Sequence, residues 1–165
     1  MQNIHGTMQF LQRFPPFNQM ENTHLAFLVE QCQLRFYGPG ESIIRPADGP
    51  VEHFYIVKQG RVVGERTHVG RQEAETTFEI TAGECFPLAA LLGERATRTE
   101  HRAAEDTFCL QLNKPAFIKL FALSEEFRDF ALRGVSSLLD QVNQQVQQKA
   151  VETLGTQYSL NNRLG

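Results

Sequence analysis

One stretch decides the fold: Gly83-Glu84-Cys85-Phe86-Pro87-Leu88, continuing through Leu91-Leu92-Gly93 to Thr97-Arg98-Thr99 and Ala103-Ala104-Glu105-Asp106-Thr107. A glycine turn, a short apolar run and a proline follow one another within it, and a proline cannot occupy the interior of a helix or of a central strand. The stretch lies among short apolar runs that glycine turns separate, which is typical of a small β domain.

The runs around this stretch are rich in β-branched and aromatic residues, as strands are. They are Ser42–Arg45, Phe54–Val57, Arg61–Gly64, Thr77–Ile80 and Thr107–Leu112. Many short strands with frequent turns in one small domain predict a barrel or a double-sheet jelly roll. We therefore expect a mainly β fold over residues 35–113: a jelly-roll β-barrel with N-terminal helices and a long C-terminal helix.

Residues 1–34 form a predicted helical segment with a break at Phe14-Pro15-Pro16-Phe17, because each proline lacks an amide donor. Asn22 or Thr23 is a suitable cap for the second helix. One face of that helix carries the apolar residues Leu25, Leu28, Val29 and Cys32.

Residues 114–154 have a helical period. Pro115 suits the first turn of a short helix, and Ser124 suits the cap of a second one that extends to about Leu154. Its distal part, Gln141–Gln148, has only Val142 and Val146 as apolar positions. This pattern fits a weak coiled-coil seam, and hence a homodimer, but a surface helix fits it equally well. Residues 155–165 form a predicted flexible tail or linker.

Composition argues against several functional classes. The net charge is −3 and the 16 basic residues are scattered, which disfavours DNA binding. The three cysteines match no disulfide framework or zinc motif, and we expect reduced thiols in a cytoplasmic protein. No apolar run reaches membrane-spanning length. The five histidines are dispersed and no catalytic motif occurs, so we expect no catalytic residue, no metal site, no required cofactor and no enzyme activity.

Three motifs precede or open the deciding stretch in a fixed order: Gly38-Pro39-Gly40-Glu41-Ser42-Ile43-Ile44, then Asp48-Gly49 with Phe54 to Val62, then Gly83-Glu84-Cys85-Phe86. Together with the leading helices they resemble the cyclic-nucleotide-binding domain family over about Phe10 to Leu139. The resemblance implies that residues 83–99 form the family's phosphate-binding cassette. In such a cassette a glutamate accepts a bond from the ribose and an arginine neutralises the cyclic phosphate.

The cassette departs from the family pattern at both positions. Pro87-Leu88 stands where the family has Gly-Glu, and leucine offers no acceptor to a ribose hydroxyl. Counting back from Ala103 puts Thr97 at the arginine position, whereas a local bulge would bring the adjacent Arg98 into the pocket. The candidate pocket residues are therefore Phe86, Leu88, Ala89, Ala90, Thr97, Arg98 and Thr99.

The segments 83–93 and 103–109 also resemble a narrower group: the N-terminal domain of bacterial signal-transduction proteins with CBS domains and a nucleotidyltransferase domain further along the chain. The resemblance implies a regulatory domain that senses a small nucleotide-like ligand and is not a high-affinity cAMP binder. The alternative is a structural or dimerisation module that binds no ligand and couples to the downstream domains.

Overall fold

The computed structural model describes residues 4–66 and 75–135. Contacts divide the chain into two units, Met1–Phe130 and Ala131–Gly165. All the strands and the helices α1 to α4 belong to the first unit, and residues 131–135 of the second are helical. The predicted continuation of that helix to Leu154, its seam at Gln141–Gln148 and the tail at 155–165 lie outside the described residues.

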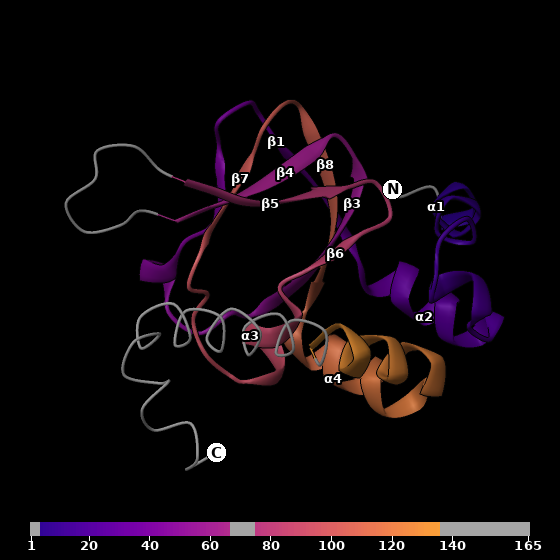
Figure 1. The fold of residues 1–165 in the computed structure, drawn as a ribbon. Coiled ribbons are helices and arrows are strands. Elements are labelled where there is room, and N and C mark those ends of the chain that lie inside the picture. The colour runs from indigo at the N-terminus through magenta and orange to yellow at the C-terminus, as the bar shows by residue number, and fades with distance from the viewer. Residues whose placement is uncertain (1–3, 67–74, 136–165) are drawn as a thin grey trace, which may run out of the picture. The chain divides into compact units, whose positions relative to one another are not determined.

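Two antiparallel sheets form the body of the first unit (Figure 1). Sheet A has the order β1-β8-β3-β6, with β1 (Gln33–Tyr37), β8 (Thr107–Asn113), β3 (His53–Gln59) and β6 (Cys85–Phe86). Sheet B has the order β2-β7-β4-β5, with β2 (Ser42–Ile44), β7 (Glu100–Ala103), β4 (Arg61–Arg66) and β5 (Glu75–Thr81). The two sheets with their flanking helices confirm the predicted jelly-roll fold.

The helices are α1 (Ile4–Leu11), α2 (Asn22–Gln31), α3 (Leu88–Leu92) and α4 (Lys114–Leu123), with short 3₁₀ turns at Phe17–Gln19 and Pro46–Asp48. The predicted break in the N-terminal helical segment is confirmed, because α1 ends at Leu11 and α2 begins only at Asn22. The predicted cap of α2 was wrong, because Glu21 holds the N-cap position and makes no side-chain bond there. Strand β1 begins at Gln33, before the predicted boundary at Arg35, because Cys32 already has extended backbone angles.

The two helix starts that the sequence predicts at Pro115 and Ser124 are confirmed. Pro115 lies in the first turn of α4, where the Asn113 side chain accepts a hydrogen bond from the Ala116 amide at 2.8 Å. Ser124 then caps the next helix, since its hydroxyl accepts a hydrogen bond from the Phe127 amide at 3.1 Å. Among the described residues, no helix is long and apolar enough to span a bilayer.

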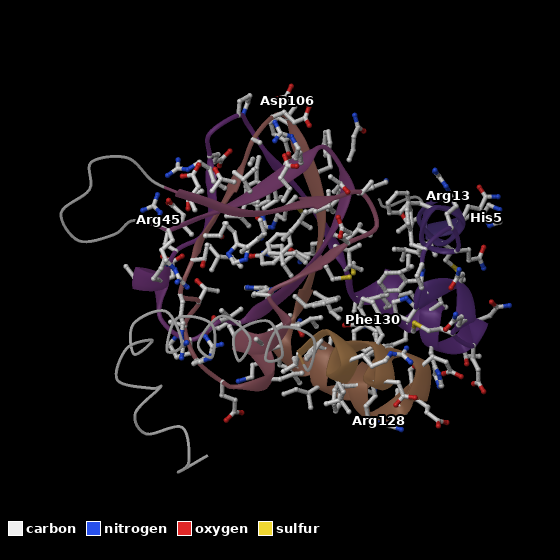
Figure 2. The ribbon with its side chains drawn as sticks, in the orientation of Figure 1. His5, Arg13, Arg45, Asp106, Arg128 and Phe130 are labelled. Carbon is white, nitrogen blue, oxygen red and sulfur yellow. The ribbon has the colours of Figure 1, made fainter. Side chains whose placement is uncertain are left out.

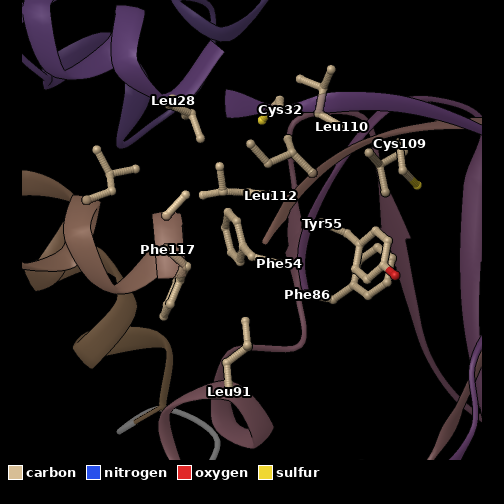
Figure 3. Close-up of a cluster of buried hydrophobic side chains, with 14 of the residues drawn as sticks. Leu28, Cys32, Phe54, Tyr55, Phe86, Leu91, Cys109, Leu110, Leu112 and Phe117 are labelled. Atoms are coloured by element: carbon tan, nitrogen blue, oxygen red, sulfur yellow. The ribbon is translucent and has the colours of Figure 1, made fainter. Parts of the chain in front are cut away.

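The outer face of sheet A carries the main hydrophobic core, against α2 and α4 (Figures 1 and 3). Phe54 is fully buried there, with its ring centroid 5.1 Å from that of Phe117 and 5.6 Å from that of Phe127. Burying each such side chain contributes roughly 1.5–3 kcal/mol. The same face holds Ile56, Leu110 and Leu112.

Because side chains alternate along a strand, the neighbours of these residues point to the space between the sheets. Tyr55, Val57 and Cys109 face inward from sheet A. Charged side chains at the ends of the strands point outward, as Arg45 and Asp106 do in Figure 2. Helix α3, which belongs to the predicted cassette, lies at one end of the two sheets (Figure 1).

Candidate functional site

Four rings form a continuous row between the sheets, which we call the ring row: Tyr55, Phe86, His101 and Phe78. Tyr55 and Phe86 are stacked at 5.0 Å between centroids and 9° between planes, as Figure 3 shows. Phe86 and His101 are stacked at 5.1 Å and 11°. Phe78 closes the row, tilted by 56° at 5.3 Å from His101. The row thus passes from sheet A to sheet B.

Strand register explains this row. Tyr55 on β3 pairs with Phe86 on β6. His101 on β7 pairs with Gly64 on β4, and Gly64 pairs with Phe78 on β5. A β-carbon added at Gly64 would lie 2.2 Å from the Phe78 ring, so the glycine leaves the space in which Phe78 lies over the sheet.

His101 is the titratable member of the ring row and is only 6% exposed. Its Nδ1 lies 3.2 Å from the Thr99 carbonyl oxygen, which can only accept, so Nδ1 carries a proton and donates it. Burial lowers the pKa of His101 from 6.5 to about 4, because the charged imidazolium loses its hydration. His101 is therefore neutral near pH 7.

The cassette helix α3 begins directly after Phe86 and Pro87. Pro87 holds its N-cap position and makes no side-chain capping bond. Leu88 is half-buried and packs against the hydrophobic core, so the residue at the predicted ribose position is apolar in its contacts as well as in its chemistry. Ala90 is buried and Ala89 half-buried in the same helix.

The segment after α3 separates the two candidates for the arginine position. Thr97 is 6% exposed and Thr99 is also buried, whereas Arg98 between them is exposed. Thr97 and Thr99 are thus buried, as His101 is, and Arg98 is not. Arg98 makes no ion pair or hydrogen bond with any residue that the structure describes.

Thr97 has an unusual feature: its Oγ1 is buried and has no hydrogen-bond partner among the described residues. Buried polar atoms nearly always form a hydrogen bond, so an unpaired buried hydroxyl is a candidate for a hydrogen bond to a ligand or to a water molecule.

The other two arginines near the cassette are engaged elsewhere. The Arg102 Nη2 lies 2.7 Å from Glu100 Oε2, and its Nε lies 3.4 Å from Glu65 Oε2. Arg95 Nη1 donates to the Ala96 carbonyl at 3.0 Å. The Arg102 pairs are partly exposed and contribute little to stability, and none of these three arginines supplies a charge to the ring row.

Glu84 serves the turn that opens the cassette. Its Oε1 accepts bonds from the Thr81 amide at 2.8 Å and from the Thr81 hydroxyl at 2.9 Å, so it stabilises the turn. The three cysteines are free thiols. Burial raises the pKa of Cys32 and of Cys109 to about 12 and raises that of Cys85 as well, so all three stay protonated and unreactive at neutral pH. The described residues contain no group of three or more metal-ligating side chains.

Of the four residues of the ring row, Phe86 is among the site residues predicted from the sequence, whereas Tyr55, Phe78 and His101 are missed, and for His101 the sequence held a usable pattern. A signal was present: Thr97, Thr99, His101 and Ala103 alternate with Arg98, Glu100 and Arg102. That alternation is the period of a strand with one inward face.

Comparison with known proteins agrees with the observed fold. The family model for the cyclic nucleotide-binding domain matches residues 34–124, more than half of the chain. The structure is similar to the regulatory domain of Toxoplasma gondii PKA with cAMP, with a TM-score of 0.71 and 19% identity over 81% of this chain and 50% of that one. The catabolite activator protein of Thermus thermophilus matches with a TM-score of 0.61 and 23% identity, over 82% of this chain and 60% of that one.

A third similar structure is the regulatory subunit of a cAMP-independent protein kinase A from Trypanosoma cruzi bound to guanosine. It matches with a TM-score of 0.71 and 22% identity, over 91% of this chain and 50% of that one. The chain thus spans about half to three fifths of the length of these proteins. At such identities the likeness shows the fold, and the family model shows the relationship. The chain belongs to the cyclic nucleotide-binding domain family.

Proposed function

We propose that this chain is a regulatory domain that senses a small molecule and binds cyclic nucleotides poorly. The carrying observation is the surroundings of the two predicted anchor positions: Leu88 packs on the core, and the buried side chain at the predicted arginine position belongs to Thr97. A cyclic phosphate buried beside Thr97 would have no cation to offset its desolvation. Arg98 does not substitute for one, because its side chain is exposed.

The neighbour from Trypanosoma cruzi supports the sensing part of the proposal, because it holds a nucleoside without a phosphate in a related fold. A ligand that binds at the site would displace α3 and, because Phe86 directly precedes Pro87 and α3, would also shift the ring row. A change in α3 would then bias the packing of the C-terminal helices and reach the next domain. We propose that the domains further along the chain are CBS and nucleotidyltransferase domains of a bacterial cytoplasmic signalling protein. The basis is that residues 83–93 and 103–109 resemble the N-terminal domain of such proteins.

Titration calorimetry with cAMP and cGMP tests the proposal. We expect no saturable heat up to millimolar nucleotide, which corresponds to a binding free energy weaker than about −4 kcal/mol. A micromolar dissociation constant for either nucleotide would overturn it.

One observation favours a second candidate, a structural module that binds nothing. Tyr55, Phe86 and His101 fill the space between the sheets and are all buried. In that case the chain would act through its C-terminal helix, as a homodimer or as a docking element. Sedimentation equilibrium tests this candidate, since a strict monomer at all concentrations contradicts its dimeric form.

A further inference from the structure

The ring row ends at a partly exposed ring, that of Phe78. Phe78 points inward by register, because it pairs with Gly64 and contacts His101. Even so, 37% of its surface is exposed, which is much more than for Tyr55 and Phe86 in the same ring row. An exposed phenyl ring on the inward side of a sheet is a platform on which a flat ring system can stack.

The buried hydroxyl of Thr97 is the second feature of this region. Thr97 is buried and lies four residues before the buried His101, so at most about 13 Å separates the two residues even if the chain between them were fully extended. Its Oγ1 can donate one hydrogen bond and accept others, and makes none among the described residues. The site therefore combines an aromatic platform with an unsatisfied hydroxyl.

The electrostatic character of the site sets the charge of its occupant. His101, which contacts Phe78, is a neutral imidazole that has lost its hydration. Arg98 is exposed and Arg102 is paired with carboxylates. Arg35 also faces inward from sheet A, and its charge acts on Tyr55 in the ring row, but it belongs to β1, about 14 Å across the sheet from β6, and its Nε donates to Gln111. An anion at the other end of the row, beside Phe78, would therefore be poorly compensated for its desolvation.

We infer that the site takes a neutral nucleoside, with the base against Phe78 and a sugar hydroxyl on Thr97 Oγ1. A nucleoside combines a flat ring system at one end with uncharged hydroxyls at the other, and these are the two chemistries that the site offers. This inference rests on the proposed function, because it names the ligand class of the site that has lost the phosphate anchors.

The test is titration calorimetry of the full chain with adenosine and guanosine, each beside its 3′,5′-cyclic monophosphate. We expect at least one nucleoside to bind, and its cyclic monophosphate to bind at least about tenfold more weakly because of the phosphate charge. If cyclic monophosphates bind tightly, the proposed function fails. If neither nucleoside binds up to millimolar concentration, the present inference fails while the poor binding of cyclic nucleotides stands.

Thr97→Val is the decisive variant, because it keeps the shape and removes the hydroxyl. We expect nucleoside affinity to fall by about tenfold, as for one lost hydrogen bond. Without ligand the variant should melt at the same or a higher temperature, since the hydroxyl that it removes is unpaired. Thr23→Val, the same change at an exposed position in α2, is the matched control. Unchanged nucleoside affinity in Thr97→Val would overturn the inference.

Discussion

The imidazole of His101 stacks on the phenyl ring of Phe86, with 5.1 Å between centroids and 11° between planes. His101 belongs to β7 in sheet B and Phe86 to β6 in sheet A, so the contact joins the two sheets. Phe86 is also separated from α3 by Pro87 alone. The start of the cassette and the centre of the jelly roll therefore share one packed contact, and close packing transmits a displacement from one to the other.

Acidification should destabilise the protein through His101. Its pKa is about 4 when folded against 6.5 for an unperturbed histidine, so between these values the unfolded chain binds the extra proton. The free energy of unfolding should thus be at its full value above pH 6.5 and should fall by about 3 kcal/mol as the pH drops to 4. Urea unfolding at a series of pH values measures this slope.

His101→Phe is the control for this prediction, because it keeps a ring between Phe86 and Phe78 and removes the titrating group. Burial also lowers the pKa of His53, which contributes to the slope of both proteins and cancels in the difference. Between pH 4 and pH 6.5, the slope of the unfolding free energy against pH should be steeper for the natural chain than for His101→Phe, by the amount that corresponds to about one proton. Parallel slopes would show that His101 is not the group responsible.

The contact between Gly64 and Phe78 should be intolerant of a single methyl group. In Gly64→Ala the new β-carbon would lie 2.2 Å from the Phe78 ring, so the ring must leave its place beside His101. We expect a loss of about 1–3 kcal/mol of unfolding free energy. Phe78→Ala in the same chain should remove most of that loss, which a double-mutant cycle detects. Gly38→Ala, where the nearest atom lies at 4.0 Å, is the matched control and should be nearly neutral.

Much of the β architecture was predictable from the sequence. The runs Phe54–Val57, Arg61–Gly64, Thr77–Ile80 and Thr107–Leu112 all lie within observed strands, because β-branched residues and glycine turns are local signals. Strand β1 was partly assigned to a helix. Its pairing with β8, about 75 residues away, carries no local signal, and four of its five residues are exposed.

The exposure of the candidate site residues could not be read from the sequence. Counting residues predicts Leu88 and Thr97 as the replaced anchors, which stays a prediction, and counting alone could not exclude a bulge that brings Arg98 inward. The stack of His101 on Phe86 was also beyond the sequence, because it depends on how two sheets approach each other. Such contacts between sheets follow from tertiary packing rather than from any sequence period.

The N-terminal segment should stabilise the turn that opens the cassette. A β-carbon at Gly83 would lie 2.3 Å from the Phe14 ring, so that ring lies directly over the glycine. Phe14→Ala should cost about 2 kcal/mol, less than a fully buried phenylalanine. It should also speed hydrogen exchange of the Gly83 amide, which donates to the Val57 carbonyl at 2.8 Å. Phe36→Ala, at an exposed ring, is the control and should leave that amide unchanged.

Restoring the two anchors should restore binding of cyclic nucleotides. Thr97→Arg supplies the cation for the phosphate, and Leu88→Glu supplies the acceptor for the ribose. Without ligand the double variant should be less stable than the natural chain by about 3 kcal/mol or more, because both new charges enter a desolvated region. Saturating cAMP should then raise its melting temperature, since a ligand that binds only the folded state stabilises it. The natural chain should show no such shift.

The matched control for this restoration is Thr97→Arg combined with Leu92→Glu, which places the same carboxylate at the other end of α3. That variant has the same net charge as the restored one but has no acceptor at the ribose position. Equal stabilisation of both variants by cAMP would mean that charge alone drives binding and that Leu88 is not the replaced anchor. Stabilisation of the restored variant alone would assign the loss of cyclic nucleotide binding to Leu88 and Thr97 together.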